Sequence, residues 1–155
     1  MSDPLRSPTL QDHGRQLASG ERPWRLDSQF WVAFFGGPLA ASAIAFLNCR
    51  RLGVAERSRR WVVAVAVAGL GAAVLFAVGL VAADVGSGAR LGNQAAGVLA
   101  YLPLLRLQKP ADRVYRFYSE KSDEEAYSSL WGPGLAAVFA LGLPVTLVLA
   151  GIAAA

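Results

Sequence analysis

The chain has 155 residues, of which 54% are hydrophobic and only 17% are charged, and its mean hydropathy is +0.38. Soluble domains typically carry about 25% charged residues, so this composition argues against a water-soluble protein and predicts one integral membrane domain. The formal net charge is +4, but the basic residues stand beside apolar runs, which is the pattern of membrane orientation signals rather than of nucleic-acid binding. We therefore expect the lipid bilayer as the main partner, and no nucleic acid.

The order of polar and apolar segments predicts an all-α protein with about four transmembrane helices. Residues 1–29 are polar and are expected to form a disordered tail, whereas residues 30–155 are expected to form the helical transmembrane domain. The predicted spans are 30–48, 61–83, 91–107 and 133–155. The uncharged second run is roughly 34 Å long as a helix, enough to cross a hydrocarbon core of about 30 Å.

The third segment is the weakest of the four. It contains Asn93 and Gln94 and has a length at the lower limit for a span. A re-entrant or interfacial segment therefore stays open as the alternative for this part of the chain. Tryptophan, which prefers the headgroup level of a bilayer, occurs at the predicted segment edges. These residues are Trp24, Trp31, Trp61 and Trp131.

The first segment contains three helix-unfriendly residues, Gly36, Gly37 and Pro38. Pro38 has no N–H, so the carbonyl of Phe34 loses its helical partner and the helix is expected to bend. The glycines let another backbone approach closely, and Pro144 predicts a second kink. Small residues also recur at intervals of four, which is typical of packed membrane helices. These stripes are Gly37/Ala41/Ala45, Gly69/Ala73/Ala77, Gly92/Ala96/Ala100 and Gly132/Ala136/Ala140. Helix packing is the simpler interpretation, and a kinked gate or a substrate cleft is the alternative.

Two basic loops supply the orientation signal. The first holds Arg50, Arg51, Arg57, Arg59 and Arg60. The second holds Arg106, Lys109, Arg113, Arg116 and Lys121. With four spans these loops share a side, and the positive-inside rule places that side in the cytoplasm. We therefore expect a multi-pass protein of the bacterial inner membrane with both termini outside the cytoplasm.

The sequence has few residues that could catalyse a reaction or bind a metal ion. No ionisable residue lies near the middle of a predicted span, where one would suggest a functional site. His13 is the only histidine and Cys49 the only cysteine, so no metal site or cofactor is expected. We expect no enzymatic activity. The leading hypothesis is a non-enzymatic accessory or interaction protein that binds itself or another membrane protein, and the alternative is a small oligomeric channel or carrier.

The stretch "FFGGPLAASAIAFLNCRRLG" resembles the opening span of small, uncharacterised bacterial multi-span membrane proteins. The matching positions are Gly36, Gly37, Pro38, Leu39, Ala40, Asn48, Arg51, Leu52 and Gly53. "LQKP" and "YSSLW" are also similar to that family, through Gln108, Ser129, Leu130 and Trp131. The resemblance covers residues 30–150. This chain differs from the family in its longer charged tail and in having Cys49. It implies several spans and no known activity.

Overall fold

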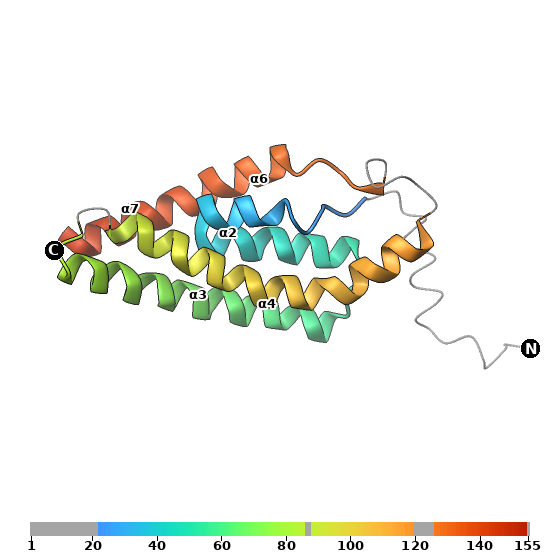
Figure 1. Cartoon of the computed structure of the whole chain (residues 1–155), viewed down its shortest axis with the longest axis horizontal. Coiled ribbons are helices and arrows are strands. Elements are labelled where there is room, and N and C mark those ends of the chain that lie inside the picture. The colour runs from blue at the N-terminus through green and yellow to red at the C-terminus, as the bar shows by residue number, and fades with distance from the viewer. Residues whose placement is uncertain (1–21, 86–87, 120–125, 155) are drawn as a thin grey trace, which may run out of the picture.

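The computed structural model describes residues 22–85, 88–119 and 126–154, and this part of the chain is helical without a strand. The helices are α2 (Gln29–Arg51), α3 (Glu56–Ala82), α4 (Gly88–Tyr118), α6 (Trp131–Ala137) and α7 (Leu143–Ala154), with the π-helix η1 (Val138–Gly142) joining the last two. Figure 1 shows them as one elongated bundle. Most of the predicted tail, residues 1–21, lies outside the described residues.

Three helical segments are long and apolar enough to cross a membrane: α2, α3 and the continuous helix α6–η1–α7 between Trp131 and Ile152. The all-α fold and the membrane character predicted from the composition are thus confirmed. The three segments differ in how far they are covered by the rest of the bundle. In their apolar windows, 56% of the residues of α2 are buried, against 22% in α3 and 11% in α6–α7. Of these three segments, helix α2 is the most enclosed.

Helix α2 is not one straight rod. Gly37 has φ 72° and ψ −167°, outside the helical region, and Figure 1 shows the chain reversing direction there. The side chains confirm the reversal, because Gln29 Nε2 and Asn48 Nδ2 both donate to Gln108 Oε1, over 3.3 Å and 2.9 Å. In a straight helix these two residues would be about 28 Å apart.

Residues 29–36 and 38–51 thus form a helical hairpin whose two ends lie together. The physical reason is the pair Gly37–Pro38: glycine adopts the positive φ without a Cβ penalty, and proline cannot donate to the preceding turn. Together they turn the expected bend into a reversal.

Helices α3 and α4 form an antiparallel hairpin on one side of α2. At one end, a Cβ on Gly92 would lie 2.7 Å from the amide nitrogen of Ala77. Further along, a Cβ on Gly69 would lie 3.4 Å from the Cβ of Ala100. The first two-thirds of α4 therefore runs beside the apolar length of α3, and Figure 1 shows its last turns projecting beyond the ends of α2 and α3.

The last helix widens just before Pro144. Residues Val138–Gly142 are π-helical, and the amide of Leu143 donates to the carbonyl of Val138. Pro144 has no N–H to continue the α-helical ladder, and such π-helical turns accommodate the mismatch within an otherwise continuous helix. The kink expected at Pro144 is thus a local widening.

The described N-terminal and C-terminal ends lie at opposite ends of the bundle (Figure 1). The carbonyl of Arg22 accepts hydrogen bonds from Arg51 and Ser128 at one end. At the other end, Leu149 of α7 packs in one cluster with Ala73, Ala77 and Ala96.

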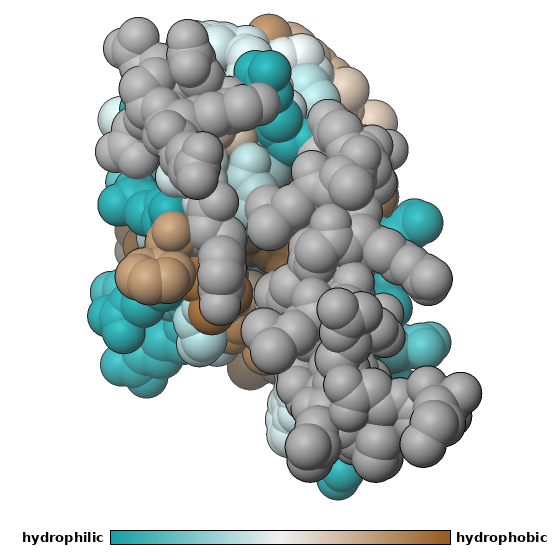
Figure 2. Space-filling view, turned by 90° about the vertical axis from the view of Figure 1, so that its right-hand side faces the viewer, coloured by the Kyte–Doolittle hydropathy of each residue, from teal (hydrophilic) through white to brown (hydrophobic). Residues whose placement is uncertain are grey.

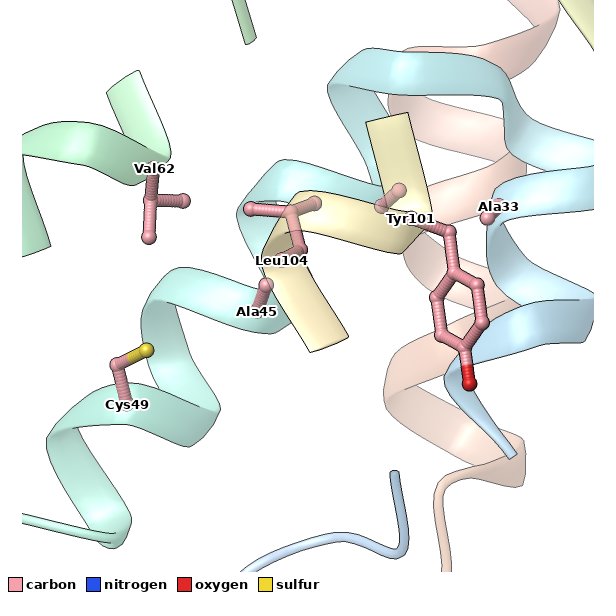
Figure 3. Packing of buried hydrophobic residues seen from close by; sticks show 7 residues of the cluster. Ala33, Ala45, Cys49, Val62, Tyr101 and Leu104 are labelled. Atoms are coloured by element: carbon pink, nitrogen blue, oxygen red, sulfur yellow. The ribbon is translucent and has the colours of Figure 1, made fainter. Parts of the chain in front are cut away.

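The buried core follows three of the four small-residue stripes. The buried residues of α3 are Val62, Gly69, Ala73 and Ala77, and the stripes of α2 and α4 are buried as well. In α6 the buried positions are Gly134 and Ala137, whereas Gly132 faces open space. Figure 3 shows the shared core: Ala33 and Ala45 from the two arms of α2 face Tyr101 and Leu104 of α4, with Val62 of α3 beyond.

Replacing Gly37 with alanine tests the reversal. The variant forces a Cβ into a positive-φ residue and against the side chain of Asn93. We expect the free energy of unfolding to fall by more than about 2 kcal/mol, from backbone strain and overpacking together. The measurement is thermal unfolding in detergent. Gly71→Ala is the control, because nothing lies within 4 Å of that position; equal stability of the two variants would contradict a strained turn.

Candidate functional site

At the tip of the α2 hairpin, α2 contacts α3, α4 and η1. Gly36 contacts Gly142 of η1, and a Cβ on Gly142 would lie 2.5 Å from the Cα of Gly36. Gly37 faces Asn93 and Gly97 of α4, and Pro38 packs against Gly69 of α3. Each residue of the Gly-Gly-Pro turn thus contacts a different helix. The structure brings these three predicted residues together as a packing centre buried within the bundle.

Two polar side chains lie near this tip without a complete set of partners. Asn93 is 1% exposed and donates from Nδ2 to Thr146 Oγ1 at 3.0 Å, while Thr146 donates to the carbonyl of Gly142 at 3.0 Å. Asn93 Oδ1 and the buried Ser42 Oγ have no hydrogen-bond partner. Unpartnered polar atoms in a buried setting are costly, and these two oxygens could accept a hydrogen bond from water or from a ligand.

The base of the hairpin is held by a cluster of three buried amides, Gln29, Asn48 and Gln108. Gln108 Nε2 donates to Gln29 Oε1 at 3.1 Å and to the carbonyl of Leu104 at 3.2 Å. Its Oε1 accepts from both partners, as described above. No member is more than 2% exposed. The cluster ties both arms of α2 to α4, and its completed hydrogen bonds indicate a structural lock.

The same lock holds the chain that precedes α2. The amide of Trp24 donates to Asn48 Oδ1 at 2.7 Å, and Asn48 Nδ2 donates back to the carbonyl of Trp24 at 3.2 Å. The guanidinium of Arg51 lies 3.9 Å above the Trp24 ring. Trp24 is 2% exposed, so it is a core residue rather than part of the membrane-interface belt expected from the sequence.

The other three tryptophans do face outwards, with exposed fractions of 60% for Trp31, 67% for Trp61 and 79% for Trp131. Each lies in the first turns of α2, α3 or α6, and those starts lie toward the same end of the bundle. The basic residues of the first predicted loop lie at this end too. Arg50 and Arg51 are the last residues of α2, and Arg57, Arg59 and Arg60 lie in the first turns of α3. Figure 2 views the bundle from this end and shows hydrophilic residues around its rim.

A second polar contact joins α4 to the chain before α6. Tyr127 donates to Asp112 Oδ1 at 2.8 Å and accepts from Arg116 Nε at 3.2 Å. Burial raises the pKa of Tyr127 to about 12, so the hydroxyl keeps its proton at neutral pH and remains a donor. Ser128 extends this contact, since its amide donates to the carbonyl of Pro23 at 2.9 Å.

A groove of about 790 Å³ opens on the outside of the bundle between the first arm of α2 and α6. Its volume falls in the range of small-molecule sites. Its polar end is formed by Arg25, Ser28, Ser128 and Ser129, and its apolar length by Val32, Phe35, Leu135 and Val138. Trp31 and Trp131 also line it. Arg25 is the only charged side chain among the lining residues.

Comparison with known proteins found no matching family model, no similar curated protein and no similar solved structure.

The predicted site residues and the observed ones overlap only in part. The sequence predicted a bend at Gly36, Gly37 and Pro38, and the structure has its packing centre at these residues. The sequence reasoning missed Gln29, Gln108 and Arg25. A signal for the first two was present, because amide side chains beside apolar runs need buried partners. Nothing local marks Arg25, since its groove forms only when α6 packs against α2.

Asn48→Ala tests the lock at the base of the hairpin. The change leaves the amide and carbonyl of Trp24 without their side-chain partners. We expect a loss of about 3 kcal/mol or more in the free energy of unfolding, because each unsatisfied buried group costs about 1–3 kcal/mol.

Tyr101→Phe provides the comparison for that measurement. It removes one bond, from Tyr101 Oη to the carbonyl of Leu26 at 3.2 Å, and should cost about 1 kcal/mol. Both values come from thermal unfolding in the same detergent. If Asn48→Ala were no more harmful than Tyr101→Phe, the amide cluster would not be the lock described above.

Proposed function

We propose that this protein is a non-enzymatic accessory or interaction protein of the bacterial inner membrane. The observation that carries the proposal is the contrast between a filled interior and bare outer helices. Inside, glycine and alanine contacts leave no room for a Cβ at the hairpin tip. Outside, only 22% of the apolar window of α3 and 11% of that of α6–α7 is buried.

The outer face of α3 supports contact with another membrane helix. Gly71 and Gly79 lie on this face with nothing within 4 Å in front of them. Small residues on a lipid-facing surface allow a second helix backbone to approach closely, and such van der Waals contact drives association within a bilayer. A surface that contacts only lipid could equally well carry leucine or valine at these two positions. A second copy of this chain or another membrane protein is the proposed partner.

Four membrane-inserted segments remain the proposed arrangement, with three full crossings and one re-entrant hairpin. The crossings are α3, residues 88–107 of α4, and α6–η1–α7. A crossing by α4 is supported by its antiparallel packing along the apolar length of α3. If α3 crosses the bilayer, a helix packed along its full apolar length extends through the same thickness of the bilayer. The end of the bundle that holds the basic residues and the described N-terminal segment is proposed to face the cytoplasm. The C-terminal end then faces away from it.

The second candidate function is a small oligomeric channel or carrier. It is favoured by the re-entrant hairpin, whose tip lies at the depth of Gly69 in α3 and faces the unpartnered Asn93 Oδ1. Non-helical backbone at membrane depth occurs where it is buried in protein or lines a water-filled cavity. Here the three tip residues are buried in protein, which supports the structural interpretation over a pore in a single chain.

Purification from the native membrane in mild detergent tests the leading proposal. We expect a complex of defined mass that contains this chain and a stoichiometric partner. Gly71→Leu and Gly79→Leu should release the partner, because the larger side chains hold the helices apart. Gly151→Leu on α7, where the glycine also faces open space, should retain it. A lone monomer would refute the proposal, and a complex of this chain alone that conducts solute in liposomes would establish the channel.

Cysteine accessibility tests the re-entrant topology in a Cys49→Ala background. Single cysteines replace Asp27 before α2, Ser58 at the start of α3 and Ala83 after α3. We expect positions 27 and 58 to react with an impermeant reagent from the cytoplasmic side, and position 83 from the outside of intact cells. Labelling of positions 27 and 58 from opposite sides would show that α2 crosses the membrane once.

A further inference from the structure

We propose that the groove between the first arm of α2 and α6 binds an anionic phospholipid. The phosphate would lie at Arg25, and one acyl chain would follow the groove toward Val138. This inference concerns a different surface from the outer face of α3, and it stands whether or not the chain has a protein partner.

The first support is the order of residues along the groove. Arg25, Ser28, Ser128 and Ser129 lie at the end where the chain enters α2 and α6, whereas Phe35, Leu135 and Val138 lie deeper along the two helices. The lining thus changes from polar to apolar along its length, as a phospholipid changes from headgroup to chain.

The second support is the charge at the polar end. Arg25 is exposed and is the one charged residue that lines the groove. Within the described ranges no carboxylate pairs with it, and its guanidinium lies 5.9 Å from the ring centre of Tyr127. The carboxylate of Asp112 accepts a hydrogen bond from Tyr127. Guanidinium binds phosphate with charge-assisted hydrogen bonds, and the hydroxyls of Ser28 and Ser129 can donate to the remaining oxygens. The hydroxyl of Ser128 already donates to the carbonyl of Arg22.

The third support is the position of the aromatic residues. Trp31 and Trp131 line the groove and are 60% and 79% exposed. Indole rings favour the boundary between headgroups and acyl chains, so they place the polar end of the groove at the level where a phosphate lies. Under the proposed orientation this is the cytoplasmic leaflet, where anionic lipids carry the negative surface potential.

The test is native mass spectrometry of the full-length chain, delipidated in detergent and titrated with lipids that share the same acyl chains. The probes are phosphatidylglycerol and zwitterionic phosphatidylcholine. We expect one phosphatidylglycerol to bind at least about fivefold more tightly than phosphatidylcholine, the ratio that one basic residue near an anionic headgroup confers. Equal affinities would overturn the assignment of an anionic headgroup.

Variants at the polar end test the role of Arg25. Arg25→Gln should abolish the preference for phosphatidylglycerol, whereas Arg50→Gln, an equal change of charge outside the groove, should leave it within about twofold. Ser129→Asp places a negative charge at the same end. It keeps an acceptor for the amide of Trp131, which lies 3.4 Å from Ser129 Oγ, and should weaken phosphatidylglycerol but not phosphatidylcholine. A preference unchanged in both groove variants would refute the site.

Variants along the apolar length test the acyl chain. Leu135→Trp fills the groove and should weaken binding of both lipids. Leu147→Trp, on the exposed face of α7 and outside the groove, should not. Glycerol phosphate, which has the headgroup chemistry without a chain, should fail to displace the bound lipid at matched concentration. Displacement would show that a free phosphate rather than a phospholipid occupies Arg25, and full binding by Leu135→Trp would contradict chain burial.

Discussion

The reversal of α2 at Gly37 is the constraint on which the rest of this fold depends. It places the tip of an unwound helix inside the bundle, where lipid and water cannot satisfy the backbone. The surrounding helices must therefore approach closely enough to exclude lipid, which explains the glycines opposite the tip: Gly69 in α3, Gly97 in α4 and Gly142 in η1. The π-helical turn before Pro144 belongs to the same contact, because Gly142 is its last residue.

The base of the hairpin needs a different kind of interaction. Two short arms joined by a glycine would separate easily if only alanine contacts held them. The side-chain amides of Gln29, Asn48 and Gln108 fix the relative position of the two arms, because their hydrogen bonds form in only one arrangement of the three side chains. Buried hydrogen-bonded networks specify a unique packing when every member is satisfied. Asn48 also binds the backbone of Trp24, so the same residue positions the chain that forms the polar end of the groove between α2 and α6.

This arrangement links the fold to the proposed surfaces. Of the three apolar segments, α2 is the most enclosed, and α3 and α6–η1–α7 lie on the outside of the bundle. The first arm of α2 spans only part of the bundle length and packs against α6, and the groove lies between them. The outer face of α3 is uninterrupted and presents Gly71 and Gly79. One surface thus suits a lipid and the other a helix, for reasons that follow from the path of a single segment.

The sequence by itself determined the class of the protein, the helical segments and most of the packing stripes, because apolar runs, prolines and small residues at intervals of four act through local geometry. It also indicated that Gly36, Gly37 and Pro38 interrupt a helix. It did not determine how far the chain turns there. A bend and a reversal use the same residues, and the choice depends on whether Gln108 of α4 is available to bind Gln29 and Asn48 together. That contact joins positions 79 and 60 residues apart, so only the tertiary structure decided that the chain reverses at Gly37 and that a groove forms between α2 and α6.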